Sequence, residues 1–163
     1  MRLIYLAAIA RAFNSAANRK SFVASRPITS YIFVSTVTPG IDQGDFLAIK
    51  NVAMENSRNS AITGLLACNG YNFMQCIEGD RSVLNALMHR IWQDDRHSGV
   101  TIVDEREART RQFAQLHVVG RFWSAQQGSG RSVLSEILAD ESVSNVARTM
   151  FQSFDSLGIK KAG

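Results

Sequence analysis

Three groups of polar side chains in this sequence have types and spacing suited to hydrogen bonding and ion pairing. They are Gln75 inside the apolar run 73–77, the adjacent pair Asn56 and Ser57, and the cluster Asp94, Arg96 and His97. An amide within an apolar strand can bond a neighbouring backbone group or face a ligand. The charged cluster can equally cap the end of a helix, where the helix dipole favours cations. The residue types alone leave both interpretations open.

The other reactive residues lack the spacing of a catalytic or metal site. No serine or cysteine comes with a placed histidine and acid, and the chain has neither a P-loop nor a G-x-G-x-x-G motif. His89 and His117 have no partners at metal-ligand spacing. Cys68 and Cys76 lie too far apart along a predicted hairpin to form a disulfide. We therefore expect no catalytic residues, no metal and no redox pair.

The elements that position these residues follow from the hydrophobic pattern. The expected order is strand 30–36, helix 42 to about 56–59, strands 61–68 and 71–77, helix 79–92, and strands 99–103 and 113–119. Asn69-Gly70 is typical of a two-residue hairpin turn, because both turn positions need positive φ. The βαββαββ order predicts an α+β, ferredoxin-like sheet with two helices on one face.

The third strand indicates that the other face must be covered as well. The side chains of Phe73, Gln75 and Ile77 point to one face, and those of Met74 and Cys76 point to the opposite face. A strand that is apolar on both sides is buried on both sides. Because the C-terminal segment has the apolar spacing of two amphipathic helices, we expect these helices to cover the second face.

Composition bounds the class of protein. The chain has 163 residues, of which 45% are hydrophobic and 20% charged, and two cysteines, which is typical of one globular domain in a reducing cytoplasm. No apolar run reaches the roughly 20 residues of a membrane helix. The net charge of +4 comes from five basic residues within 1–28, a stretch without acids. The rest of the chain is nearly neutral, so we expect no nucleic-acid partner.

Three parts of the chain are predicted. They are a basic N-terminal extension without stable structure at 1–28, the sheet domain at 29–123 and a C-terminal helical cap at 124–163. The extension could be a targeting segment, a basic helix on an anionic or membrane surface, or the product of an upstream start codon. Its apolar run is short and is followed by Arg11, so we favour a plain extension and expect no membrane contact.

Four motifs in the sheet domain match a known family. They are Asn56 with Ile62-Thr-Gly-Leu-Leu66, Phe73-x-Gln75-x-Ile77-Glu-Gly79, Ile91 with Asp94-x-Arg96-His97, and Arg111-x-Phe113. Together, at this spacing, they resemble the BLUF domain, a blue-light sensor that uses FAD. The resemblance runs from about Ser30 to Trp123. It implies that residues 29–123 bind FAD non-covalently between two helices on one sheet face, with FMN as the alternative flavin.

The resemblance also implies a role for individual residues. Gln75 matches the glutamine that hydrogen-bonds the flavin and rearranges on illumination, and Asn56 matches the first of an asparagine pair near the ring carbonyls. Ile49 and Ile91 match the apolar side chains on either side of the ring. The residues that match the ribityl and phosphate end are Asp94, Arg96 and His97. Apolar walls with a few fixed polar groups are what a flavin needs.

Four positions depart from the family pattern. The photoactive tyrosine of the family falls on Phe33, which has no hydroxyl and is much harder to oxidise. The second asparagine is Ser57, whose shorter side chain reaches less far towards the ring, and a serine of the first helix is Ala53. The family's Trp-x-Met is replaced by Leu116-His117-Val118. We therefore expect a bound flavin to lack the family's reversible red shift under blue light.

Two functions remain open at this point. The first is a BLUF-type photoreceptor-like protein that binds FAD and signals through protein–protein contacts rather than by catalysis, with photochemistry in doubt because of Phe33. The alternative is a flavin-free, light-insensitive interaction or oligomerisation module on the same fold. In either case we expect a cytoplasmic bacterial protein that forms a homo-oligomer and acts on a downstream signalling protein.

Overall fold

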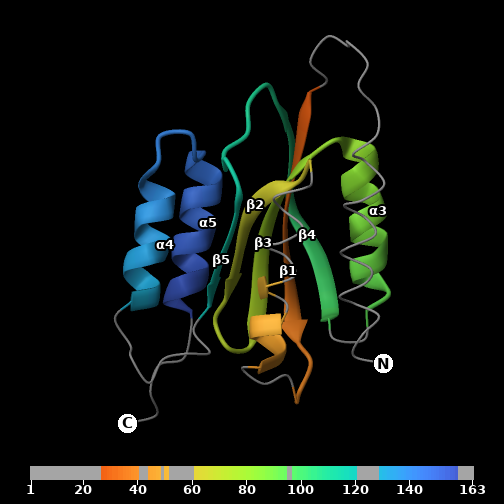
Figure 1. Cartoon of the computed structure of the whole chain (residues 1–163), viewed down its shortest axis with the longest axis vertical. Helices are drawn as coiled ribbons and strands as arrows, with labels where there is room; N and C mark the ends of the chain where they lie inside the picture. The colour runs from red at the N-terminus through yellow and green to blue at the C-terminus, as the bar shows by residue number, and fades with distance from the viewer. Residues whose placement is uncertain are drawn as a thin grey trace.

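The computed structural model arranges five strands in one sheet with helices packed on it (Figure 1). It describes residues 27–40, 44–48, 50–51, 61–94, 97–120 and 129–157. The strands are β1 (Ile28–Val37), β2 (Thr63–Cys68), β3 (Asn72–Gly79), β4 (His97–Ala108) and β5 (Leu116–Gly120). The helices are α3 (Arg81–Trp92), α4 (Ser129–Ala139) and α5 (Asn145–Ser156). Residues 44–48 and 50–51 are also helical and are called the Phe46 segment.

The strands lie in the order β4-β1-β3-β2-β5. β1 runs antiparallel to both β3 and β4, β2 runs antiparallel to β3, and β5 runs parallel to β2. β4 and β5 follow one another in the chain yet lie at opposite edges, so the segment that joins them passes along one end of the sheet (Figure 1). The predicted α+β, ferredoxin-like fold is confirmed.

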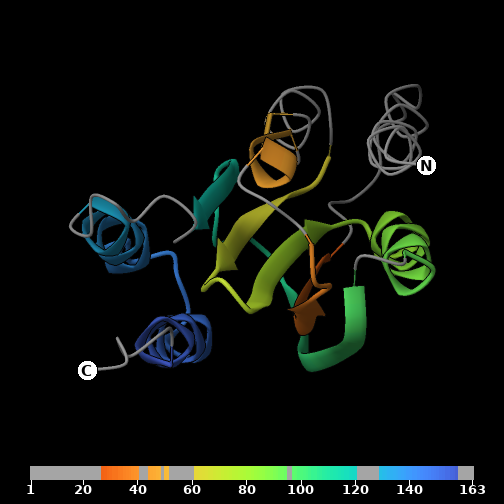
Figure 2. The same cartoon turned by 90° about the horizontal axis from the view of Figure 1, so that it is seen from below.

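The two faces of the sheet are covered by different helices, as the alternation in β3 predicts. The face to which Phe33 and Gln75 point, called the Gln75 face, carries α3 and the Phe46 segment. The opposite face, called the Cys76 face, carries α4 and α5. Figure 2 shows the Phe46 segment (orange) and α5 (dark blue) on opposite sides of the sheet. The predicted cover by two C-terminal helices is therefore confirmed.

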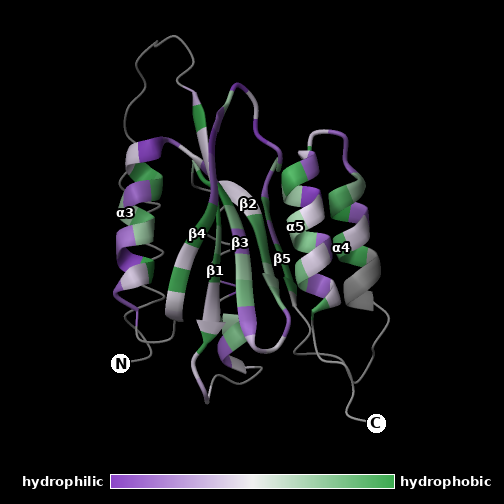
Figure 3. Cartoon of the chain, turned by 180° about the vertical axis from the view of Figure 1, so that it is seen from behind, coloured by the Kyte–Doolittle hydropathy of each residue, from purple (hydrophilic) through white to green (hydrophobic). Residues whose placement is uncertain are grey.

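The core of the Cys76 face joins the sheet to the C-terminal helices. Its buried side chains are Ile32, Leu65, Ala67, Met74, Cys76, Phe113, Leu134, Leu138, Val143, Ala147, Phe151 and Phe154. Figure 3 shows that the central strands are mainly hydrophobic, whereas each helix carries both hydrophobic and hydrophilic residues. Amphipathic helices of this kind gain their stability from burial of one side against the sheet.

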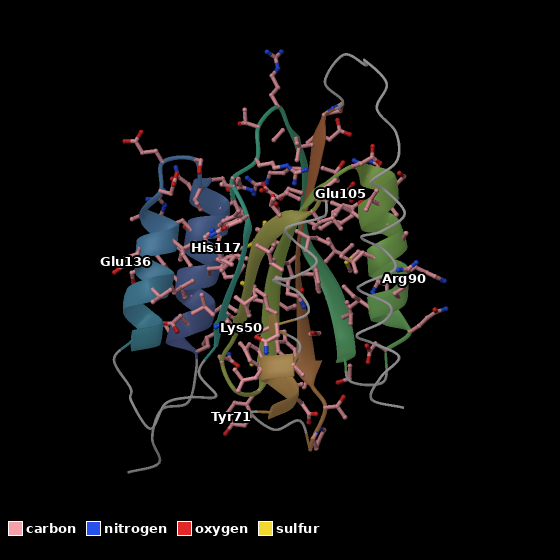
Figure 4. The ribbon with its side chains drawn as sticks, viewed as in Figure 1. Lys50, Tyr71, Arg90, Glu105, His117 and Glu136 are labelled. Atoms are coloured by element: carbon pink, nitrogen blue, oxygen red, sulfur yellow. The ribbon has the colours of Figure 1, made fainter. Side chains whose placement is uncertain are left out.

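An N-cap residue and one apolar side explain why α3 forms. Its N-cap is Asp80, whose carboxylate accepts a hydrogen bond of 2.9 Å from the backbone N–H of Ser82. The buried residues of the helix are Leu84, Leu87, Met88 and Ile91. Each such side chain contributes about 1.5–3 kcal/mol when fully buried. Arg90, by contrast, points away from the sheet (Figure 4).

Strands β2 and β3 approach each other closely at Gly64. A Cβ atom at this position would lie 1.9 Å from the carbonyl oxygen of Cys76, and the backbone φ is +151°. Only glycine fits such a contact, because it has no Cβ. The N–H of Gly64 also donates to the carbonyl of Gln115 (3.2 Å), which ties β2 to the segment that enters β5.

The turn between β2 and β3 differs from the predicted two-residue Asn-Gly turn. Cys68 pairs with Phe73, and of the two predicted turn residues Gly70 alone has a positive φ, of 98°. The Oδ1 atom of Asn69 instead accepts hydrogen bonds from the backbone N–H groups of Tyr71 (3.1 Å) and Asn72 (2.9 Å). The turn prediction was wrong because the Asn69 side chain acts as an acceptor that holds a wider turn. Relative to a two-residue turn, the register of the two strands is shifted by two residues. Because side chains alternate with a period of two, each one stays on its predicted face.

β4 is longer than predicted. It continues through Asp104 and Glu105 to Ala108, whereas the sequence indicated an end at Val103. The charged residues 104–107 did not indicate a strand in the sequence. They are tolerated because β4 is an edge strand, whose residues stay partly exposed on the side without a neighbouring strand. Asp104 and Arg106 of this strand form an ion pair of 2.8 Å.

β5 is shorter than predicted and begins at Leu116 rather than at Phe113. The backbone N–H of Phe113 donates to the carboxylate of Glu78 (3.0 Å), so it is not used in a strand ladder. The predicted extension 1–28 lies outside the described residues except for 27–28, and most of the predicted helix 42–59 does so as well. The three-part division of the chain stays a prediction.

Candidate functional site

One row of side chains runs across the Gln75 face from edge to edge. In order over β4, β1, β3, β2 and β5, the row consists of Ile102, Phe33, Gln75, Leu66 and Val118. Four of these side chains are apolar and one is an amide. Gln75 is therefore the place in the row where a hydrogen bond to a ligand can be made.

Two apolar clusters flank Gln75. The α3 cluster consists of Tyr31, Phe33, Ile62, Ile77, Leu84, Leu87, Met88 and Ile91. The Phe46 cluster consists of Phe46, Leu66, Cys68 and Phe73. Within it, the rings of Phe46 and Phe73 are stacked, with centroids 6.1 Å apart and planes within 8°. Because Gln75 pairs with Phe33 of one cluster and Leu66 of the other, its amide lies at the boundary between two apolar walls.

The amide of Gln75 is only half-buried, and it forms no side-chain hydrogen bond with another described residue. The purely structural interpretation requires such a bond to a neighbouring backbone group. Within the part of the chain that the structure describes, that bond is not made. An amide of this kind between two apolar clusters fits a ligand with a polar edge and an apolar, flat body.

Phe33 is fully buried in the α3 cluster and is the direct cross-strand neighbour of Gln75. It offers the amide a ring and no hydroxyl. A tyrosine does lie nearby, because Tyr31 points to the same face two residues earlier. Its phenol donates to Oδ1 of Asn85 on α3 (2.7 Å) and receives a hydrogen bond of 3.4 Å from Arg81. Burial raises the pKa of Tyr31, so this phenol stays protonated at neutral pH.

The other sequence-predicted site residues are only partly within the described chain. Ile91 lies in the α3 cluster with Phe33. Asp94 lies two residues beyond the end of α3, and its backbone N–H donates to the carbonyl of Ile91 (3.2 Å). The predicted residues that fall outside the described chain are Ile49, Asn56, Ser57 and Arg96, together with the side chain of His97. Their assigned roles stay predictions.

A buried carboxylate that sequence reasoning left without a role organises one end of the sheet. Glu78 at the end of β3 is fully buried, and its oxygens accept from the backbone N–H groups of Gln112 (3.0 and 2.9 Å) and Phe113 (3.0 Å). The side-chain amide of Gln112 also donates to it (3.1 Å). A detectable signal was present, because Glu78 falls on the face of β3 that otherwise carries Met74 and Cys76.

Arg111 joins the same end of the sheet. Its guanidinium donates to the hydroxyl of Thr63 (2.9 Å) and to the carbonyl of Glu78 (2.6 Å), so it connects the beginning of β2 with the end of β3. Burial lowers the pKa of Arg111, although the nearby Glu78 carboxylate counteracts this effect. The arrangement explains Arg111 of the Arg-x-Phe motif as a structural residue.

His117 points to the Cys76 face, on the side of α4 and α5 (Figure 4). Its ring meets that of Phe113 edge-on, with centroids 6.2 Å apart. Partial burial lowers the pKa of the imidazole, because the charged form is poorly solvated there. Leu116 and Val118, its neighbours in β5, belong by alternation to the Gln75 face.

Both cysteines are buried and free, which confirms that they do not form a disulfide. Burial raises the pKa of Cys68 to about 11 and that of Cys76 to about 12. Among the described residues, no group of three or more acidic, histidine or cysteine side chains is placed to hold a metal ion. None of the described helices is long and apolar enough to cross a membrane.

Comparison with known proteins supports the assignment to one family. A family model described as BLUF, sensors of blue-light using FAD, matches residues 28–119, more than half of the chain. Over 77 residues, the chain is 36% identical to the photoactivated adenylate cyclase subunit beta of Euglena gracilis. This match covers 47% of the chain and 9% of the cyclase subunit.

Solved structures share the fold. BlrB, described as a BLUF protein in its dark state, is 26% identical with a TM-score of 0.57, and the match covers 80% of this chain and 99% of that chain. Klebsiella pneumoniae BlrP1 with FMN and cyclic diGMP is 26% identical with a TM-score of 0.65. That match covers 80% of this chain and 35% of the BlrP1 chain. Because the family model matches more than half of the chain, the chain belongs to the BLUF family, sensors of blue-light using FAD.

Proposed function

We propose that this chain binds FAD non-covalently on the Gln75 face, with the ring between the Phe46 segment and α3, and that it lacks the tyrosine-initiated photocycle of its family. One observation carries the proposal. The half-buried amide of Gln75 lies at the boundary of two apolar clusters, directly beside a buried Phe33. Apolar walls with one directed polar group suit a flat ring with a polar edge.

The described residues that would hold the flavin come from β3, from α3 and from the segment that follows α3. Gln75 on β3 would bond the polar edge of the ring, and Ile91 on α3 would contribute to one wall. Asp94, two residues beyond the end of α3, would lie at the ribityl and phosphate end if it keeps the role that the family motif gives it. Ile49 and Asn56 are assigned by the family motif alone. FMN is the alternative flavin, in keeping with the FMN of BlrP1.

Phe33 is the reason for expecting a light response unlike that of the family. When bound, the flavin supplies absorption of blue light and the electron chemistry of its ring. Phe33 adjoins Gln75 but has no phenol to donate an electron, a proton or a hydrogen bond. The amide of Gln75 therefore has no hydroxyl partner at this position that could drive its rearrangement.

We further propose that the output is a protein–protein contact and not catalysis by this chain. A downstream signalling protein, a homo-oligomer and a bacterial cytoplasm are expected, and two buried free thiols are in keeping with a reducing compartment. Light scattering on the purified protein, before and after blue light, would measure its oligomeric state. A monomer under both conditions would contradict the homo-oligomer.

One observation favours a second function, a flavin-free interaction module. Phe33 is completely buried against α3, so this part of the Gln75 face is already filled by protein side chains. If the packing extends over the whole face, no ring can enter. Occupancy of the site therefore separates the two functions.

A titration with three flavins tests the proposal. Fluorescence anisotropy of FAD, FMN and riboflavin is followed as wild-type protein is added, with ADP as a competitor that lacks the flavin ring. We expect saturable binding of FAD that FMN displaces and ADP does not, because the proposed contacts of Gln75 and Ile91 are made to the ring. Absence of binding at about 100 μM protein, where even weak complexes with Kd values in the micromolar range form, would favour the flavin-free module.

A further inference from the structure

Gln112 makes hydrogen bonds in two opposite directions from the segment between β4 and β5. Towards the sheet, its side-chain N–H donates to the Glu78 carboxylate (3.1 Å). Towards α5, its side-chain oxygen accepts from the backbone N–H of Ser144 (2.9 Å), and its backbone carbonyl accepts from the hydroxyl of Ser142 (2.7 Å). One buried residue thus bridges the end of β3 and the beginning of α5.

The two partners of Gln112 hold well-defined positions. Glu78 lies three residues beyond Gln75 on β3 and is fixed by its bonds to the backbone of Gln112 and Phe113. Ser144 is the N-cap of α5, and its hydroxyl accepts from the N–H of Ala147 (3.2 Å). A displacement of the end of β3 would therefore change the hydrogen-bond partners at the first turn of α5.

The remaining contacts of α5 with the sheet do not fix its position in the same way. Ala147, Phe151 and Phe154 pack on the Cys76 face through apolar contacts, which are non-directional and tolerate small shifts. The amide of Gln112 is directional. Only one orientation lets it donate to Glu78 and accept from Ser144. The flipped amide would place its oxygen against the Glu78 carboxylate and its N–H groups against the N–H of Ser144.

We propose that Gln112 is a positioning residue whose hydrogen bonds form a latch between the end of β3 and the beginning of α5. Through this latch, the side chain couples β3, the strand that carries Gln75, to the C-terminal helices. The coupling part of the proposal rests on the proposed flavin site, whereas the latch itself does not. No part of it requires catalysis or an additional ligand.

Hydrogen–deuterium exchange tests the latch without flavin. Gln112→Met keeps the length of the side chain and removes both amide bonds, and Gln115→Met is the matched control at an exposed glutamine of the same segment. We expect backbone exchange in the first turns of α5 to rise about tenfold in Gln112→Met, the effect of losing hydrogen bonds to a charged and a helix-end partner. Exchange in α3 and in the control should not change. Unchanged α5, or an equal rise in α3, would overturn the latch.

A reciprocal exchange of side chains distinguishes a specific contact from general destabilisation, and it decides the question if Gln112→Met does not fold. Gln112→Glu sets two carboxylates against each other and should increase exchange in α5. Adding Glu78→Gln restores one donor and one acceptor across the same contact, so exchange should return to within about threefold of wild type. Failure of the double variant to recover any protection would contradict the proposed pairing.

The coupling is measured with saturating FAD. FAD should alter exchange at the first turn of α5 in wild type and leave it unaltered in Gln112→Met, although both proteins bind the flavin. Binding without any change at α5 in wild type would overturn the coupling. If FAD does not bind, the proposed flavin site is rejected together with the coupling, while the flavin-free exchange data still decide the latch.

Discussion

Replacing Gln75 with methionine separates the two interpretations of its amide, because they predict opposite changes in stability. Methionine has nearly the same length but no amide. In the flavin-free protein, the variant removes a half-buried amide that bonds no other described side chain or backbone group. Full burial of such a group without a bond costs about 1–3 kcal/mol in mutational data. At half burial, Gln75→Met should therefore raise the free energy of unfolding by about 0.5–1.5 kcal/mol.

The affinity for FAD should change in the opposite direction. One hydrogen bond between Gln75 and the flavin contributes about 0.5–1.5 kcal/mol, so its loss should raise the Kd roughly two- to thirteenfold. Urea unfolding measures the first quantity and a fluorescence titration the second. Gln115→Met, at an exposed glutamine, should leave both unchanged. A loss of more than about 1 kcal/mol in stability with an unchanged Kd would show instead that the amide is a structural group that does not contact the flavin.

Three further predictions follow from individual side chains. Phe33→Tyr places a hydroxyl beside Gln75, so the flavin-loaded variant should show a reversible red shift under blue light that wild type lacks, and a difference spectrum without that shift would contradict the role given to Phe33. His117 has a lowered pKa in the folded protein, so the unfolded chain binds more protons as the pH falls below its usual value of 6.5, and stability is lost there. The free energy of unfolding of wild type should thus fall more steeply between about pH 7 and 5 than that of His117→Asn, and equal slopes in urea titrations would argue against a buried neutral imidazole. With pKa values of about 11 and 12, Cys68 and Cys76 should not react with a thiol reagent at about pH 8 until urea unfolds the chain, and rapid labelling of the native protein would disprove their burial.

Much of the fold could be predicted because its pattern is local. The alternation in β3 identified two covered faces, and the spacing of apolar residues identified α3 and the C-terminal helices. The edge strand β4 was harder, since its charged residues follow from exposure and not from strand propensity. The hairpin turn was predicted wrongly because the Asn69 side chain accepts two backbone N–H groups there and holds a wider turn.

The site was predictable where a residue's role follows from its strand position. Gln75 and Phe33 are neighbours because their strands pair in that register, and the family motif places both. Glu78 and Gln112 were missed as a pair because their contact joins residues 34 positions apart through a segment without regular structure. Neither hydrophobic pattern nor spacing encodes such a contact, and a single buried acid on an apolar face was its sequence signal.

The proposed function requires that the Gln75 face holds a flavin that does not run the family's photocycle. The most direct test is the visible absorption spectrum of wild-type protein purified with FAD supplied, recorded before and after blue light. We expect a protein-bound flavin band that does not move under illumination. A reversible red shift would contradict the role given to Phe33, and the absence of any bound flavin would contradict the site itself.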